Sequence, residues 1–191
     1  MKNYDLNMQE KLETVIRLKM DSPGIARSTE IWAICHDLAE AQYPPALTFF
    51  IEGLNDSAWD WRQRCLQMIG FHYDIPPNSE VTDKVRKMLE SDPDNNVRMT
   101  AANVLGAISG LPDSSLVTAL NSDPDWFVRR SAYLAILQLA GVKYKIYLGE
   151  DERFNFESEE IEPTLKEVKR VLREEGKEIS VNTLGFDDQD V

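Results

Sequence analysis

Apolar residues recur at helical spacing along most of the first 141 residues, and one arrangement of them returns four times. In its clearest copy Val97, Ala101 and Leu105 lie four positions apart, which is the spacing of one face of an amphipathic helix. Arg98 sits inside this apolar face instead of opposite it. The same offsets recur, most faintly at the first, around Arg27, Arg62 and Arg129.

The spacing of these arginines indicates a repeated pair of helices. Successive arginines are 35, 36 and 31 residues apart, a length typical of helix-pair repeats. Each unit is expected to contain a first helix, a short turn rich in Asp and Pro, and a second helix that carries the arginine. The first helices are predicted at 6–20, 46–54, 81–90 and 114–121. We therefore predict an all-α fold, an α-solenoid of about four helix pairs.

The repeat pattern ends near Gly141, so we divide the chain into two parts. Residues 1–141 are predicted to form the repeat solenoid. Residues 142–191 are predicted to contain a loop rich in acidic and aromatic residues, one further helix over 159–176 and a polar tail. Gly106, Gly110 and Gly141 lie where a second helix is expected to fray or stop.

A permanent charge on a buried helix face needs a partner, because an unpaired charge there would cost several kcal/mol. The only acid that recurs in step with all four arginines lies six residues before each of them, in the turn. We predict a ladder of Asp–Arg pairs at this turn edge, formed within a unit or between adjacent units. Its members are Asp21 and Arg27, Asp56 and Arg62, Asp92 and Arg98, and Asp123 and Arg129. Asp92, Asp94, Asp123 and Asp125 are also expected to cap helix N-termini.

Two stretches, "DPDNNVRMTAANVLGAI" and "DPDWFVRRSAYLAILQL", carry a family resemblance. Both have an Asp-rich turn and Val-Arg, and the first also has the Ala pair and Leu-Gly, so they look like HEAT-like repeats of the short bacterial type associated with phycobilisome lyases. The resemblance is good over 86–141, fair over 46–73, weak over 6–42 and absent from 142–191. It implies an α-solenoid whose usual work is to hold other proteins, and it implies no particular reaction.

Net charge disfavours several classes of partner. The chain carries −12, and residues 149–191 contribute −8 of it. A nucleic-acid partner is unexpected, because phosphate binding needs a basic surface. No stretch is apolar enough to span a membrane, and the first twenty residues carry charges throughout. The chain also has only two cysteines, which are too few for a disulfide framework, so we predict a cytoplasmic protein.

Motifs for chemistry are missing from the sequence. It shows no Gly-rich phosphate loop, nucleophile elbow or HExxH. Cys35, His36, Cys65 and His72 lack the spacing of a zinc site, so we predict no metal and no cofactor. A phycobilin-lyase-like enzyme or accessory subunit remains an alternative by resemblance, and a helical-repeat DNA glycosylase is a second one that the charge balance opposes. We predict a protein without enzymatic activity.

Positions opposite the buried stripe of the second helices are predicted to line a groove that binds another protein. They lie one, two, five and nine residues after each repeat arginine, so Thr100 and Ser131 are also expected to face outward. The predicted contact residues are Trp32, Gln63, Arg64, Gln67, Phe71, Met99, Asn103, Arg130 and Leu134. Alternatively, the C-terminal segment folds back and covers part of this surface.

Two further features concern the edges of the solenoid. Trp59 and Trp126 each precede a repeat arginine by three residues. They are predicted either to pack against the turns or to be exposed and contribute to binding. The acidic run 150–162, which contains Phe154 and Phe156, would suit a basic partner. We therefore predict a monomer that binds a protein with a basic surface, as an inhibitor, an immunity-type protein or a scaffold.

Overall fold

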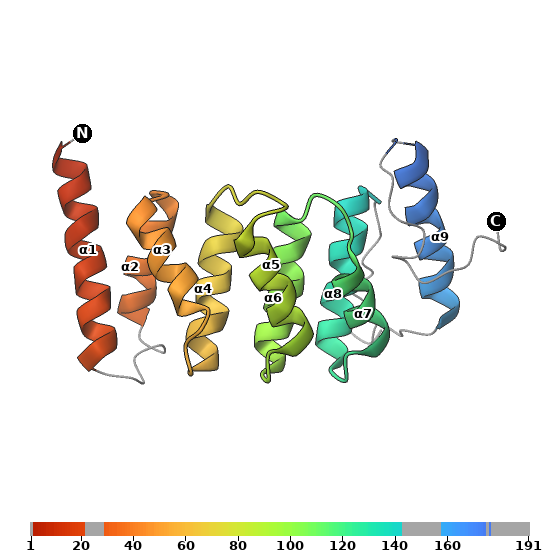
Figure 1. Ribbon diagram of the computed structural model, residues 1–191, viewed down its shortest axis with the longest axis horizontal. Helices are drawn as coiled ribbons and strands as arrows, with labels where there is room; N and C mark the ends of the chain where they lie inside the picture. Colours follow the sequence, from red (N-terminus) through yellow and green to blue (C-terminus); the bar gives the residue numbers. More distant parts are fainter. Residues whose placement is uncertain (1, 22–28, 143–157, 175, 177–191) are drawn as a thin grey trace.

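The computed structural model describes residues 2–21, 29–142, 158–174 and 176, and every regular element in these ranges is an α-helix (Figure 1). The helices are α1 (Lys2–Asp21), α2 (Thr29–Glu40), α3 (Pro44–Gly53), α4 (Trp59–His72), α5 (Glu80–Ser91), α6 (Asn95–Ile108), α7 (Ser114–Ser122), α8 (Trp126–Ala140) and α9 (Ser158–Glu174). None of them is long and apolar enough to cross a membrane.

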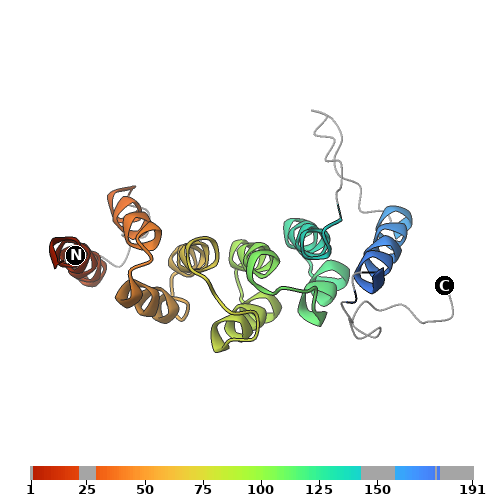
Figure 2. The same cartoon turned by 90° about the horizontal axis from the view of Figure 1, so that it is seen from above.

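The helices stack side by side in two rows. Figure 2 shows α2, α4, α6 and α8 in one row and α3, α5 and α7 in the other. Within the first row α6 packs against both α4 and α8, and each second helix also packs against its own first helix. This is the side-by-side stacking of helix pairs that defines a solenoid. The predicted all-α solenoid is confirmed.

Aspartates set where the second helices begin. Asp94 accepts hydrogen bonds from the backbone N–H groups of Asn96 and Val97, and Asp125 does the same at the start of α8. The prediction that Asp92 and Asp123 also cap N-termini is wrong. They end α5 and α7, and each carboxylate accepts the backbone N–H of the N-cap two residues later.

Two helical glycines bring neighbouring second helices unusually close. A Cβ atom added to Gly70 of α4 would lie 2.5 Å from Val104 of α6, and one added to Gly106 would lie 3.0 Å from the Cβ of Ala135 in α8. Gly106 was expected near a helix end but lies inside α6, where only a glycine lets the two backbones approach so closely. Gly141 ends α8 in the left-handed conformation at φ 70°, as predicted.

One hydrophobic core runs through the described helices. It includes Trp61 and Phe50 near the amino end and Leu105 and Ile136 in the middle units. The buried face of α9, which contains Leu165, Val168 and Leu172, belongs to the same core and packs against α8. The division of the chain at residue 141 stays a prediction.

Candidate functional site

The turn edge is the first candidate, because it gathers the repeat arginines. Arg62 donates from Nε and Nη2 to the two carboxylate oxygens of Asp92, over 2.8 and 2.7 Å. Its Nη1 donates to the backbone carbonyls of Asp56 and Ser57 in its own turn. Each guanidinium can therefore tie its own turn to the carboxylate of the next unit.

The following unit repeats this geometry. Arg98 donates from Nε and Nη2 to Asp123, over 2.8 and 3.1 Å, and from Nη1 to the carbonyl oxygen of Asp92. Among the two ladder arginines that pair with a described carboxylate, the partner is thus the aspartate of the following unit and not the one six residues earlier. The earlier residue contributes its backbone carbonyl instead.

The ends of the ladder differ from its middle. At the amino end Asp56 pairs with Lys19 of α1, over 2.5 Å. At the other end Arg129 donates from Nη1 to the carbonyl oxygens of Asp123 and Pro124. Arg27 and the side chain of Asp21 lie outside the described residues.

The middle pairs are buried enough to hold the units together. Side chains of Arg62 and Asp92 are 10% and 6% exposed, and those of Arg98 and Asp123 are 12% and 7% exposed. The hydrogen bond to Asp92 is the main cause that raises the pKa of Arg62 above its ordinary value, and Asp123 does the same for Arg98. These two arginines are thus fully engaged within the chain.

The outward side of α4, α6 and α8 is the second candidate. We call it the second-helix face and define it by Arg64, Gln67, Phe71, Met99, Asn103, Ala107, Arg130, Leu134 and Gln138. Of these, Arg64, Phe71, Asn103, Ala107 and Gln138 are exposed, and the other four are half-buried. Phe71 is the largest exposed apolar side chain on this face, with 55% of its surface accessible.

The second-helix face contains fewer positions than the helical spacing predicted. The position two residues after the repeat arginine was expected to face outward, yet Thr100 and Ser131 are buried at that position. Gln63, a predicted contact residue, is half-buried and donates to the hydroxyl of Thr100 over 3.1 Å. Close approach of neighbouring second helices at Gly70 and Gly106 turns these flanking positions into an interface between helices.

The predicted tryptophans lie in three different environments. Trp32 of α2 is half-buried, with its ring 5.1 Å from that of Trp61 and the guanidinium of Arg64 stacked 5.2 Å above it. Trp59 is 38% exposed at the start of α4. Trp126 is half-buried against Phe127, with ring centroids 4.9 Å apart. The more exposed ring at that helix start is Phe127, at 57%, a residue that the sequence reasoning missed.

Charge is distributed unevenly between the second helices and the rest of the chain. Helices α4, α6 and α8 together contain five arginines, no lysine and a single acidic residue, Asp60. The whole chain nevertheless has 33 acidic and 21 basic residues. None of the residues that define the second-helix face is a carboxylate, so this face gives a basic partner nothing to pair with.

Comparison with known proteins decides the repeat type. A family model of HEAT repeats matches residues 47–137, which span α4 to α7 and parts of α3 and α8. This segment consists of HEAT repeats. Comparisons with curated proteins and with solved structures gave no match. HEAT repeats are generally protein-interaction modules, which agrees with the coarse functional prediction but names no partner.

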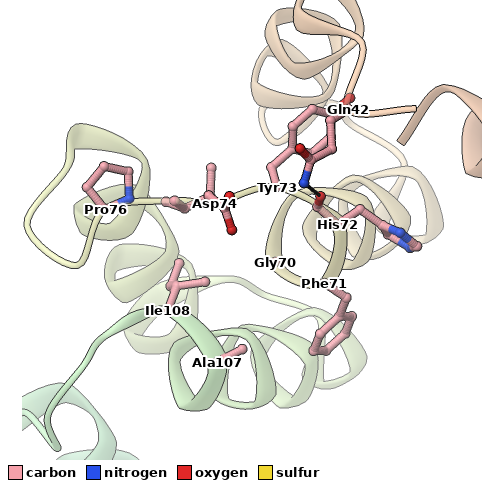
Figure 3. Close-up of a pocket in the computed structure, with 10 residues that line it drawn as sticks. Gln42, Gly70, Phe71, His72, Tyr73, Asp74, Pro76, Ala107 and Ile108 are labelled. Carbon is pink, nitrogen blue, oxygen red and sulfur yellow. Dashed lines mark hydrogen bonds between the residues drawn. The ribbon is translucent and has the colours of Figure 1, made fainter. Parts of the chain in front are cut away.

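A pocket opens beside the second-helix face, where α4 and α6 end. It has a volume of about 560 Å³ and lies between the end of α4, the loop that follows it and the end of α6 (Figure 3). Phe71 and Ala107 contribute to both the pocket and the face. Gln42 reaches across to donate to the carbonyl oxygen of His72, over 2.8 Å.

The side chains around this pocket form no recognisable catalytic set. No serine, cysteine or lysine lines it, and its polar side chains are those of Gln42, His72, Tyr73 and Asp74. Tyr73 donates its hydroxyl to the carbonyl oxygen of Tyr43 over 3.2 Å, and burial raises its pKa to about 12. The Tyr73 hydroxyl is therefore protonated at neutral pH and already bonded to the backbone.

The cysteines and histidines considered for zinc do not converge. Cys35 and Cys65 are buried free thiols, and burial raises the pKa of Cys35 to about 12 and that of Cys65 further. His36 and His72 contact each other edge to face, with ring centroids 5.0 Å apart. Within the described ranges no three His, Cys, Asp or Glu side chains are grouped to hold a metal ion.

Stability is expected to fall in mild acid because of His72. Burial, followed by the charge of His36, lowers the pKa of His72 below 6.5, while Glu40 acts in the opposite direction. The unfolded chain therefore takes up this proton first, so stability is full above about pH 6.5 and declines below it.

Urea unfolding at about pH 7.5 and about pH 5.5 checks this expectation. The His72→Gln variant should lose less free energy of unfolding between the two conditions than the wild-type protein does. An Asp37→Asn variant, changed at an exposed surface pair, should behave as wild type. An unchanged loss in His72→Gln would show that another group controls the pH dependence.

Proposed function

We propose that this protein is a non-catalytic module that binds another protein through the second-helix face. The observation that carries the proposal is an exposed aromatic ring, Phe71, on a face that lacks carboxylates in a strongly acidic chain. Depletion of charge around aromatic and Met side chains is typical of the centre of a protein interface. The adjoining pocket provides room for a side chain of the partner.

A basic partner, which the net charge suggested, would have to use other surfaces. Exposed carboxylates of the described residues lie on α1, α2 and α5, for example Glu13, Glu40 and Glu90. At the turn edge Asp92 and Asp123 already pair with arginines, and Asp94 and Asp125 cap helices. Residues 150–157 of the acidic run 150–162, Phe154 and Phe156 among them, lie outside the described residues. A basic partner and a cytoplasmic location stay predictions.

The role of inhibitor, immunity-type protein or scaffold is proposed ahead of the enzymatic alternatives. A phycobilin-lyase-like activity would need a set of cooperating reactive groups, and no hydrogen bond among the described residues joins the side chains of His72, Tyr73 and Asp74 at the pocket. A DNA glycosylase would need a basic surface for phosphates, and Arg64 and Arg130 are the only charged members of the second-helix face.

Two exposed phenylalanines provide a matched test of where a partner binds. Phe71 lies on the second-helix face and Phe127 at the turn edge, with exposures of 55% and 57%. With a partner captured on the full chain and then purified, Phe71→Ala should weaken binding at least about fivefold, because it removes an aromatic anchor. The Phe127→Ala variant should change the affinity less than about twofold.

Isothermal titration calorimetry with each purified variant measures both affinities. Both residues are exposed, so each substitution should leave the thermal unfolding of the protein nearly unchanged. If Phe127→Ala weakens binding and Phe71→Ala does not, the partner uses the turn edge and the proposed face is wrong.

A further inference from the structure

The repeat arginines use the two edges of the guanidinium for different tasks. In Arg62 and Arg98, Nη1 holds the carbonyl oxygen six residues earlier, at 2.9 Å in both units. The opposite edge, formed by Nε and Nη2, holds both oxygens of an aspartate from the next unit. This edge is thus a carboxylate receptor that the fold builds twice.

Arg129 has the first of these interactions but not the second. Its Nη1 donates to the carbonyl oxygen of Asp123 over 2.7 Å and to that of Pro124 over 3.2 Å, the same two offsets as in the preceding units. No carboxylate of the described residues pairs with its Nε and Nη2 edge. The guanidinium is therefore anchored in the orientation of the other two, with the receptor edge open.

The open edge remains reachable from solvent. Arg129 is half-buried as a residue. In the described part of the chain, the side-chain polar atoms that are both buried and unpartnered are Trp61 Nε1 and Ser109 Oγ. The nitrogen atoms of Arg129 are not among them, so its Nε and Nη2 are not sealed from solvent.

We propose that the Nε and Nη2 edge of Arg129 binds an aspartate or glutamate side chain of a partner protein. This contact lies at the turn edge and so goes beyond the proposed function, which concerns the second-helix face; it rests on that proposal only for the claim that the carboxylate belongs to a protein. Two bidentate Arg–Asp pairs in the same molecule show that this anchored edge matches a planar carboxylate. Nucleic acid is disfavoured, because phosphate binding needs several cations and α8 offers only Arg129 and Arg130.

The arginine Nε–H signals of the ¹⁵N-labelled full chain test the proposal without a known partner. The probes are two blocked peptides, acetyl-Gly-Asp-Gly-amide and acetyl-Gly-Asn-Gly-amide, which differ only in the carboxylate. We expect the Arg129 signal to shift with the Asp peptide, with half-saturation on the order of 10 mM, and not with the Asn peptide. The signals of Arg62 and Arg98 should not move, because both edges are occupied.

Arg64 provides the matched control for charge alone. It is an exposed arginine whose guanidinium rests on the Trp32 ring and is not held by the carbonyl oxygens of a turn, so its Nε–H signal should shift much less than that of Arg129. In the Arg129→Gln variant, the Asp peptide should no longer perturb the backbone signals at the start of α8.

Four results would overturn the inference. The first is an equal response of Arg64 and Arg129, and the second is an equal effect of both peptides. The third is an Arg129 Nε–H that exchanges slowly in the free protein, since a carboxylate of the chain would then already hold the edge. The fourth is a shift caused by inorganic phosphate and not by the Asp peptide. None of these depends on the Phe71 experiment, so the two proposals can fail separately.

Discussion

Replacing Asp92 by asparagine is expected to lower the free energy of unfolding by about 3 kcal/mol. The substitution keeps the shape of the side chain and an oxygen for the backbone N–H of Asp94, but it removes the charge that faces Arg62. Because the two side chains are only 10% and 6% exposed, water cannot replace the lost carboxylate. Urea unfolding monitored by circular dichroism measures the change.

The Lys11–Asp37 pair supplies the control for this loss. Its side chains are 28% and 50% exposed, so Asp37→Asn should cost at most about 1 kcal/mol. A double substitution, Arg62→Met with Asp92→Leu, removes both charges and should recover part of the stability lost in Asp92→Asn. Equal losses for Asp92→Asn and Asp37→Asn would mean that the ladder pairs contribute no more than surface ion pairs.

Replacing Gly70 by alanine is expected to destabilise the protein by about 2 kcal/mol, although alanine is the better helix former. The added Cβ would lie 2.5 and 2.6 Å from the two methyl carbons of Val104. A valine in a helix has one strongly preferred rotamer, so these methyl groups cannot turn away without strain. The shift must then be taken up by the α4–α6 packing, and thermal and urea unfolding would both detect it.

A second substitution separates crowding from any other effect of alanine at this position. Val104→Ala removes both methyl groups and should cost stability alone, because it leaves a cavity. Combined with Gly70→Ala, it should give a total loss at least about 1 kcal/mol smaller than the sum of the single losses. Additive losses would show that the two positions do not compete for the same space.

Helix pairs could be predicted from the sequence because their signals are local. Apolar spacing around Arg98 and Arg129, together with Asp-Pro turns before each, marks a helix and its start within about fifteen residues. Gly141 as the end of α8 is equally local, since a glycine with positive φ is a common helix stop. Stacking then follows, because each pair has one apolar face to bury.

Features that depend on the distance between units could not be predicted in the same way. The sequence left open whether each arginine pairs within its own unit or with the next, and for Arg62 and Arg98 the structure gives the next. Thr100 and Ser131 were expected to face outward, but the close contact at Gly70 and Gly106 buries them. Lys19, which pairs with Asp56, belongs to no repeated pattern.

The contact of Lys19 with Asp56 also bears on which end of the solenoid unfolds first. At the turn edge a single ammonium links the first helix pair to the next, and the side chains of Lys19 and Asp56 are 29% and 21% exposed. The later units use a buried bidentate Arg–Asp pair at the same place. In a linear array each module is held only by its neighbours, and an end module has one neighbour. We therefore expect fraying to start with α1 and α2, and α6, which packs between α4 and α8, to be the last helix to melt.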